Sequence, residues 1–314
     1  MARNVKISLV GLSPISHNDS KDYAALTEKM IAFIEKNIQK VLPDKPDIIL
    51  LPECCDRYPG FTDMDELIRY EDHRGNQVRD FLCELAKKNS VNIAYSSVRP
   101  LPEDTAHPRR NSTQIIGRDG NIVGIYDKNH LVIEENTRHN IGFGKEAKVI
   151  DTDFGKVACA ICFDLNFEEL MYNYAPQKPD LIAFCSQYHG GLAQDIWAYR
   201  CRAYLAGCIF NNQCRIINPY GEVVASSTNY HNYVSATVNF DYVLAHLDYN
   251  WSKISAAKQK YGEALTVHDP GYVGSVMLTC EDPNMNINHI VKEFEIELLD
   301  DYMARARKVR NDAL

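Results

Sequence analysis

The chain of 314 residues is 45% hydrophobic and 24% charged, which are proportions typical of a globular protein with a substantial buried core. Its formal net charge is −8, and its Lys and Arg residues are scattered rather than clustered. This acidic, scattered balance argues against nucleic acids and anionic membranes as partners, since both need a concentrated basic surface. It favours small-molecule chemistry.

The start of the chain has a basic residue followed by a short apolar stretch, residues 7–12, which Ser8 and Gly11 interrupt. No small-residue cleavage site follows, so a first strand is favoured over a signal peptide. No apolar run reaches the roughly 18 residues that a membrane span needs. Ten cysteines without a secretory signal indicate a reducing compartment, and we expect a cytoplasmic protein.

The first part of the chain alternates between strand and helix patterns. A strand is expected over residues 5–12, a helix over residues 21–42, and a strand buried on both faces over residues 46–53. A second helix over residues 76–89 and a strand over residues 91–98 continue the alternation. This order predicts an α/β protein.

Hairpin patterns follow. Residues 112–131 form two alternating segments around the Asp119-Gly120 pair, which is a strong hairpin signal. Further hairpins are expected over residues 147–162 and 214–227. Between these two we expect a short helix from Phe167, a strand over residues 180–186 and a helix over residues 193–210.

We therefore predict one mixed α+β domain over residues 1–270, with helices outside packed sheets, because no linker-like or repetitive segment interrupts it. Residues 271–314 form a C-terminal extension with a charged, helix-like end. This extension either docks on a partner subunit or is a solvated terminus.

Three expected strands end in side chains that suit nucleophilic catalysis. Glu53 follows the buried strand, Lys128 ends a hairpin strand, and Cys162 ends another. A reactive cysteine needs a proton acceptor and a group that stabilises the developing oxyanion. Strand ends are also where sites assemble in layered α/β folds. Each residue alone could be structural, as a thiol in the core or a charged group in solvent, but the three together favour an active site.

These segments resemble the nitrilase superfamily of carbon–nitrogen hydrolases. The family's Pro-Glu is present as Pro52-Glu53, its Tyr-x-Lys-x-His-Leu as residues 126–131, and its Ile-Cys-Tyr-Asp as residues 161–164, with Phe163 in place of Tyr. The three motifs stand in the family order, and the resemblance covers about residues 5–243.

The resemblance implies a four-layer α-β-β-α sandwich that forms a homodimer or a larger homo-oligomer. We expect no cofactor and no metal. It also implies roles for the site residues. Glu53 would be the general base, Cys162 the nucleophile, and Lys128 the oxyanion stabiliser together with the backbone N–H of Phe163. Many members have a second glutamate that positions the substrate. Here Glu135 is preferred over its neighbour Glu134 because its spacing to Gly142 better matches the ureido-hydrolase pattern.

The implied activity is hydrolysis of a non-peptide C–N bond in a small amide or N-carbamoyl compound through a cysteine thioester. A nitrile substrate is less favoured, because nitrilases have Trp-Glu after the nucleophile and this chain has Phe163-Asp164. The chain also departs from its relatives at Asn166, Glu168 and residues 202–206, so close relatives do not define the substrate.

Several alternatives stay open. Cys162 could be activated by His130 or His189 in a Cys–His hydrolase, although a nucleophile elbow usually has flanking glycines, absent here. The same fold could also be a binding or scaffold protein with an idle thiol. A zinc site is disfavoured because Cys159 and Cys162 have no second pair of ligands.

We expect structural roles for most other residues near the motifs. Cys159 is expected in the core, and Cys54 and Cys55 either line the pocket or pack in the core. Asp164, Phe167 and Glu169 are expected to fix the helix after the nucleophile, and His130 to pack or hydrogen-bond.

Overall fold

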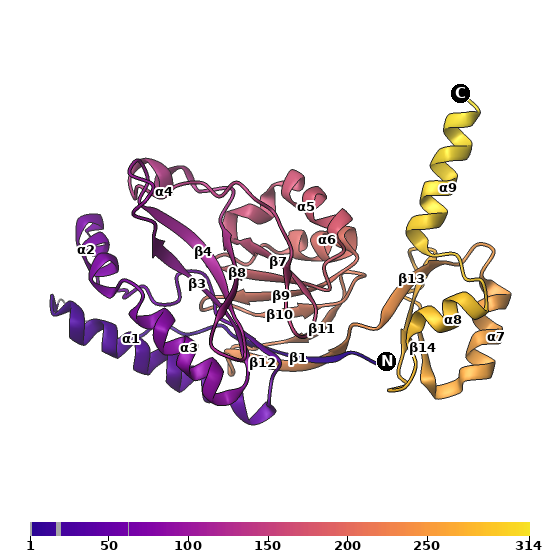
Figure 1. The fold of residues 1–314 in the computed structure, drawn as a ribbon, viewed down its shortest axis with the longest axis horizontal. Helices are drawn as coiled ribbons and strands as arrows, with labels where there is room; N and C mark the ends of the chain where they lie inside the picture. Colours follow the sequence, from indigo (N-terminus) through magenta and orange to yellow (C-terminus); the bar gives the residue numbers. More distant parts are fainter. Residues whose placement is uncertain (1, 17–19, 62) are drawn as a thin grey trace. The chain divides into compact units, whose positions relative to one another are not determined.

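The computed structural model describes residues 2–16, 20–61 and 63–314. Most of the chain is built on two six-stranded sheets (Figure 1). In spatial order, the first sheet consists of β12 (Tyr233–Asn239), β1 (Asn4–Val10), β2 (Ile48–Leu50), β3 (Asn92–Pro100), β4 (Arg109–Ile116) and β5 (Ile122–Asp127). The second consists of β11 (Val223–Ser226), β10 (Arg215–Ile217), β9 (Tyr204–Ile209), β8 (Leu181–Ser186), β7 (Lys156–Ile161) and β6 (Ile150–Asp151).

The two sheets follow the same plan. In each, three successive strands are parallel, β1-β2-β3 in the first and β7-β8-β9 in the second. Antiparallel strands extend the first sheet beyond β3 and the second sheet on both sides. The expected hairpins are present as β4-β5, β6-β7 and β10-β11. Contacts between the sheets include the thiol of Cys208 on β9, which donates to the carbonyl of Leu50 on β2 at 3.2 Å.

Helices cover the outer face of each sheet (Figure 1). The first sheet carries α1 (Tyr23–Ile38) and α3 (Gln77–Asn89), whose apolar faces pack on it. α2 (Met64–Arg74) packs beside α1. The second sheet carries α5 (Glu168–Tyr174) and α6 (Leu192–Cys201). Its contacts include the Tyr174 hydroxyl, which donates to the carbonyl of Cys159 on β7 at 2.9 Å. The predicted four-layer α-β-β-α arrangement is thus confirmed.

Short elements complete this part of the chain: α4 (Ile133–Thr137), η1 (Leu42–Asp44), η2 (Cys162–Asn166) and η3 (Ala175–Gln177).

The helix expected over residues 193–210 is wrong in its second half. α6 ends at Cys201, where Arg202 adopts a left-handed backbone with φ 56°, and Tyr204–Ile209 forms the buried strand β9. β9 pairs with both β8 and β10. Pairing on both sides within the sheet therefore decides the conformation of this apolar segment.

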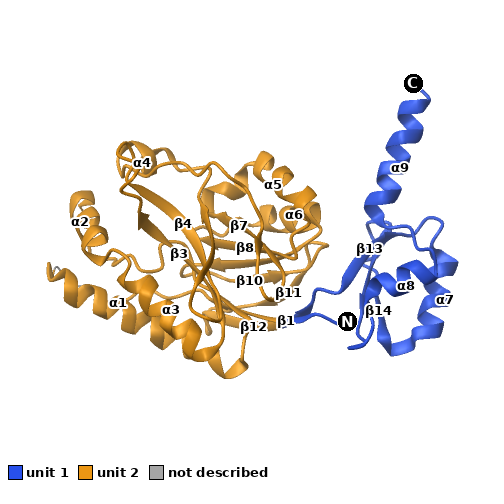
Figure 2. Cartoon of the chain, in the orientation of Figure 1, with its two compact units in different colours: residues 1–5, 237–314 blue, residues 6–236 orange. Residues whose placement is uncertain are grey.

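The described chain divides into two compact units (Figure 2). The larger unit is Lys6–Ala236, and the smaller is Thr237–Leu314 together with the start of the chain up to Val5. The smaller unit has an antiparallel sheet of β13 (Tyr242–His246), β15 (Ser275–Cys280) and β14 (Leu265–His268). Its other elements are α7 (Trp251–Tyr261), η4 (Gly262–Ala264), α8 (Ile287–Glu293) and α9 (Leu299–Asp312).

The smaller unit has its own apolar core, in which Ile254 of α7 and Ile290 of α8 pack with Leu278 of β15. The domain boundary expected at residue 270 falls inside this sheet, between β14 and β15. The pairing of β15 with both β13 and β14 keeps these residues in one unit.

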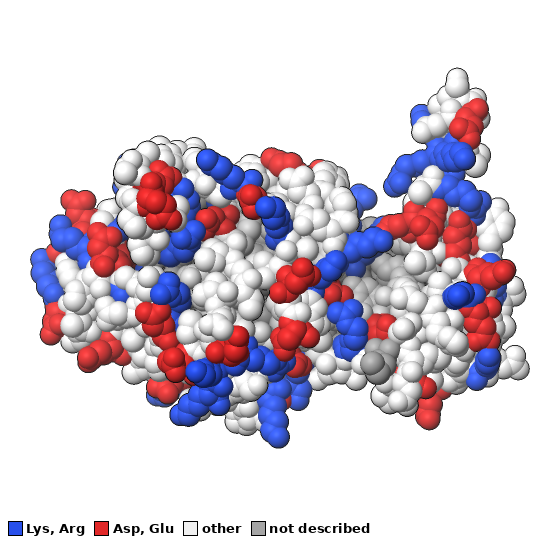
Figure 3. All heavy atoms as spheres, viewed as in Figure 1, with Lys and Arg blue, Asp and Glu red and all other residues white. Residues whose placement is uncertain are grey.

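The surface agrees with the scattered charge of the sequence. Basic and acidic side chains are interspersed over the face shown in Figure 3. Within the described ranges, no helix has both the length and the apolar character to cross a membrane.

Candidate active site

Glu53 lies just beyond the end of β2 and is 5% exposed. Its Oε1 accepts hydrogen bonds from Lys128 Nζ at 2.9 Å and from Asn111 Nδ2 at 2.8 Å. Its Oε2 accepts from the backbone N–H of Gln187 at 3.3 Å. A buried carboxylate with three donors is held in one orientation.

Lys128 directly follows β5 and is 1% exposed. Its ammonium bridges two carboxylates, Glu53 Oε1 at 2.9 Å and Glu135 Oε2 at 2.8 Å. Burial lowers the pKa of Lys128, but the charges of Glu53 and Glu135 outweigh burial and raise it above its ordinary value. Lys128 is therefore a fixed cation at any pH near neutrality.

The approach of the chain to this lysine requires a glycine. Gly144 donates its N–H to the carbonyl of Lys128 at 2.8 Å, and a Cβ at this position would lie 2.0 Å from the carbonyl oxygen of Asp127. Only glycine permits this contact.

Cys162 is the first residue of η2, directly after β7, and is partly exposed. Its φ is 47°, a left-handed conformation that is strained for a residue with a side chain, and Cys54, next to Glu53, has φ 50°. The chain therefore makes a sharp turn at the cysteine without a flanking glycine. Burial, reinforced by the charge of Glu53, raises the pKa of Cys162 to about 11, although Lys128 and a hydrogen bond with Ser186 oppose the shift. The charges of Glu53 and Lys128 thus both act on the thiol of Cys162.

Asp164 joins the segment that carries the cysteine to the segment that carries the lysine. It is fully buried, and it accepts from the Tyr126 hydroxyl at 2.8 Å, from the backbone N–H of His130 at 2.8 Å and from that of Ile161 at 3.0 Å. The ring of His130 also contacts Asp164 at 3.2 Å and stacks on Phe167 with ring centroids 3.9 Å apart. Asp164, His130 and Phe167 thus fix the local structure.

The two glutamates that are candidates for positioning the substrate have different surroundings. Glu135 reaches Lys128 and also accepts from Asn111 Nδ2 and from the backbone N–H of Val132, each at 2.8 Å. Glu134 is exposed and pairs with Arg138 at 3.2 Å on the surface of α4. The geometry thus brings Glu135, and not Glu134, together with Lys128.

Three groups in the site were not predicted from the sequence: Asn111, Ser186 and the backbone N–H of Gln187. Asn111 could have been found from the hairpin. Counting outward from the Asp119-Gly120 turn pairs position 111 with position 128, and the observed Ser112-to-Asp127 register gives the same pair. Ser186 and Gln187 carry no such local signal, because only the packing of the sheets brings the end of β8 beside Glu53.

The remaining cysteines take structural positions. Cys159 is fully buried on β7, and Cys54 and Cys55 are also buried. All ten cysteines are free thiols. Among the described residues, no group of three or more His, Cys, Asp or Glu could hold a metal ion.

The histidines of the Cys–His alternative are engaged elsewhere. The Nδ1 of His130 faces Asp164, and that of His189 accepts from the backbone N–H of Gly191 at 3.1 Å.

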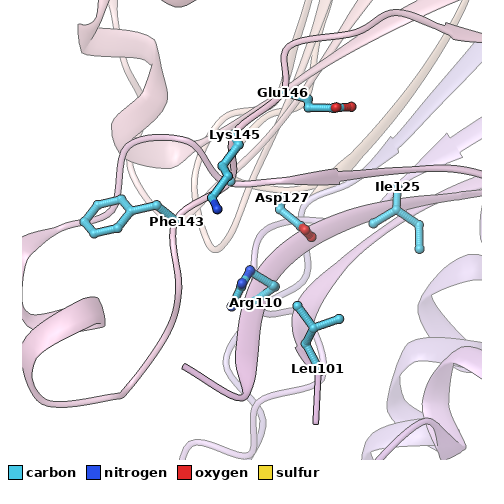
Figure 4. A pocket seen from close by; sticks show the side chains of 8 residues that line it. Leu101, Arg110, Ile125, Asp127, Phe143, Lys145 and Glu146 are labelled. Carbon is cyan, nitrogen blue, oxygen red and sulfur yellow. The ribbon is translucent and has the colours of Figure 1, made fainter. Parts of the chain in front are cut away.

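A pocket of about 330 Å³ lies beside Asp127, at the end of β5 (Figure 4). Its lining residues are Leu101, Arg110, Ile125, Asp127, Phe143, Gly144, Lys145 and Glu146. Successive side chains of a strand point to opposite faces, so Asp127 points away from the face on which Lys128 binds Glu53 and Glu135. Asp127 accepts hydrogen bonds from Arg99 and Ser112 instead. This pocket is therefore separate from the cluster around Cys162.

The sequence model of the carbon–nitrogen hydrolase family matches residues 6–245. The chain belongs to this family. The predicted resemblance to the nitrilase superfamily and the predicted carbon–nitrogen hydrolase class are thus confirmed. A curated relative is the omega-amidase NIT2-A of Xenopus laevis, 24% identical over 232 residues that cover 66% of this chain and 82% of the relative.

Solved structures of the family share the fold. Nit3 of Saccharomyces cerevisiae, described as a member of branch 10 of the nitrilase superfamily, matches with a TM-score of 0.62 and 20% identity over 83% of this chain and 95% of that chain. An amidase from Nesterenkonia sp. matches with a TM-score of 0.62 and 13% identity over 75% of this chain and 90% of that chain.

Proposed function

We propose that this carbon–nitrogen hydrolase is an amidase that cleaves small carboxamides through a thioester on Cys162. The observation that supports the proposal is the ion pair of Lys128 with Glu53 at 2.9 Å, together with the action of both charges on the Cys162 thiol, which comes from a third, distant segment. Amidase relatives support the amide as substrate, and a structure of a Nesterenkonia amidase variant is described as showing Michael addition of acrylamide at its active site cysteine.

In the first half-reaction the Cys162 thiol gives its proton to Glu53, and the thiolate attacks the carbonyl carbon of the amide. The carbonyl electron pair moves to oxygen, where Lys128 and the backbone N–H of Phe163 stabilise the oxyanion. A cation about 4 Å from that charge contributes about 4 kcal/mol at an effective dielectric constant of about 20. The tetrahedral adduct then expels the amine, which takes the proton from Glu53 and leaves a thioester.

In the second half-reaction Glu53 takes a proton from water, and the resulting hydroxide attacks the thioester carbonyl. Collapse of this adduct releases the carboxylic acid and returns the proton to the sulfur. Glu135 positions Lys128 and presents a carboxylate oxygen to the N–H groups of the substrate. An N-carbamoyl compound offers the same carbonyl and N–H groups, so it is the second candidate substrate class.

The test is a release assay across carboxamides, N-carbamoyl compounds and nitriles, combined with intact-mass detection of the acylated protein. We expect turnover of carboxamides, with the added mass on wild-type protein and not on Cys162→Ala. Glu53→Gln is expected to cost several orders of magnitude in turnover. Turnover by folded Cys162→Ala would refute the nucleophile. Nitrile hydrolysis without amide hydrolysis would refute the substrate class, and no turnover with an unreactive Cys162 would indicate a binding protein.

We further propose that the protein is cytoplasmic and forms homodimers. The free thiols of all ten cysteines suit a reducing compartment. Light scattering on the purified chain tests the second proposal, and a monomer at micromolar concentration would contradict it.

A further inference from the structure

Asn111 lies on β4, opposite Lys128 on the neighbouring strand, and is 1% exposed. Its backbone carbonyl accepts from the N–H of Lys128 at 2.8 Å. Its side-chain Nδ2 donates to Glu53 Oε1 and to Glu135 Oε1, each at 2.8 Å. Asn111 and Lys128 therefore both bridge the same two carboxylates, and the four side chains form a closed ring.

The orientation of the Asn111 amide follows from its neighbours. Both contacts are carboxylate oxygens, which accept hydrogen bonds when ionised, so the NH₂ group and not the carbonyl must face them. The Oδ1 is buried and receives no hydrogen bond from the described residues. The amide is thus anchored in the site by its two donors.

Each oxygen of a carboxylate has about two acceptor positions. On Glu53, Lys128 and Asn111 occupy both positions of Oε1, whereas Oε2 accepts, among the described residues, only from the N–H of Gln187, at a longer 3.3 Å. On Glu135, Lys128 and the N–H of Val132 occupy Oε2, and within the described part of the chain Oε1 accepts only from Asn111. One acceptor position is left on Glu53 Oε2 and one on Glu135 Oε1.

We propose that Asn111 is a positioning residue that saturates Oε1 of Glu53, so that Oε2 is the oxygen that exchanges protons with Cys162. In the same way it holds Glu135 with one oxygen position directed to the substrate. The inference rests on the proposed amidase function. In the proton transfer the S–H bond of Cys162 breaks as an O–H bond forms on Oε2, and the sulfur electron pair then forms the bond to the amide carbon.

The charged and titratable groups around the two carboxylates come from several elements. They are Lys128 after β5, Cys162 in η2, Cys185 on β8, Cys54 and Arg57 after β2, and His139 after α4. Asn111 is a neutral donor in this set. Its loss therefore removes one stabilising N–H from each carboxylate without changing the net charge of the site.

The experiment compares Asn111→Leu, which has a similar branched shape but no donor, with Asn111→Ala, which cannot clash if the larger leucine prevents folding. Ser112→Ala is the matched control, because it removes a buried polar group from the next position of β4, on the opposite face. For each folded variant kcat and KM are measured against pH with a carboxamide that the wild-type enzyme hydrolyses.

We expect both Asn111 variants to lose about 100-fold or more in kcat, in the range of a misdirected general base, with KM changed less than about threefold. The acidic limb of the pH–rate profile should move to higher pH, because each carboxylate has lost a donor that favours its charged form. A residue with a purely structural role would not move this limb. Ser112→Ala should keep kcat and the limb.

Two results would overturn the inference in an active enzyme: folded Asn111 variants with kcat within about threefold of wild type, or an acidic limb that does not move. Failure of the proposed function has a different signature. In that case the wild-type protein itself hydrolyses no amide and forms no acylated Cys162.

Discussion

Replacing Lys128 by Met tests whether the ammonium holds the site together. The substitution removes two ion pairs, at 2.9 and 2.8 Å, and leaves the buried carboxylates of Glu53 and Glu135 without their cation. Removing one partner of a buried pair costs about 3–5 kcal/mol, a large part of a total stability of about 5–15 kcal/mol. With an m-value of about 4 kcal/mol per molar guanidinium chloride, the unfolding midpoint should fall by about 1 M.

The double variant Lys128→Met/Glu135→Gln provides the control. It removes one carboxylate charge along with the ammonium, so the site regains its original net charge. We expect it to be more stable than Lys128→Met alone by about 1.5 kcal/mol or more, and Glu135→Gln alone completes the double-mutant cycle.

Tryptophan fluorescence can follow the larger unit. The chain has two tryptophans, Trp197, 2% exposed on α6, and Trp251, 64% exposed on α7 in the smaller unit. In a Trp251→Phe background the signal comes from Trp197 alone. A cost of Lys128→Met below about 1 kcal/mol, or a double variant less stable than the single one, would refute the stabilising role of the ammonium.

Three further predictions concern neighbouring groups. Asp164→Ala should lower the free energy of unfolding by about 2–6 kcal/mol, because two buried backbone N–H groups lose their acceptor. Asp164→Asn should lower it less, and equal losses in the two variants would contradict this prediction. The thiolate absorbance of Cys162, taken as the difference between wild type and Cys162→Ala, should titrate near pH 11. In Glu53→Gln it should titrate at lower pH, because the charge of Glu53 raises the pKa of Cys162. A wild-type midpoint near 9.0 would contradict this prediction. Glu135→Gln should lower kcat about tenfold or more and Glu134→Gln less than about twofold, and similar effects of the two would show that Glu135 has no special role.

The predicted elements were confirmed where the local pattern leaves a single solution. The continuous apolar run before Glu53, the Asp119-Gly120 hairpin before Lys128 and the apolar strand before Cys162 each specify a strand and the residue at its end. Apolar alternation and turn residues act over a few positions, so the sequence alone could show which side chains end the strands.

The prediction of a helix over residues 193–210 was wrong in its second half because local patterns act over only a few positions. Its apolar residues fit a buried helix as well as a buried strand, and pairing with β8 and β10 made Tyr204–Ile209 a strand.

Thus the sequence by itself determined the family, the layered fold and the order of the three motifs, because short-range patterns and spaced motifs carry that information. Only the tertiary structure decided that Glu135 and not Glu134 faces Lys128, that Asn111 closes the ring, and that Asp164 ties the two motif segments together. These contacts join residues that lie on different strands and loops. Their geometry is set by sheet register and by the packing of one sheet on the other, which no local periodicity encodes.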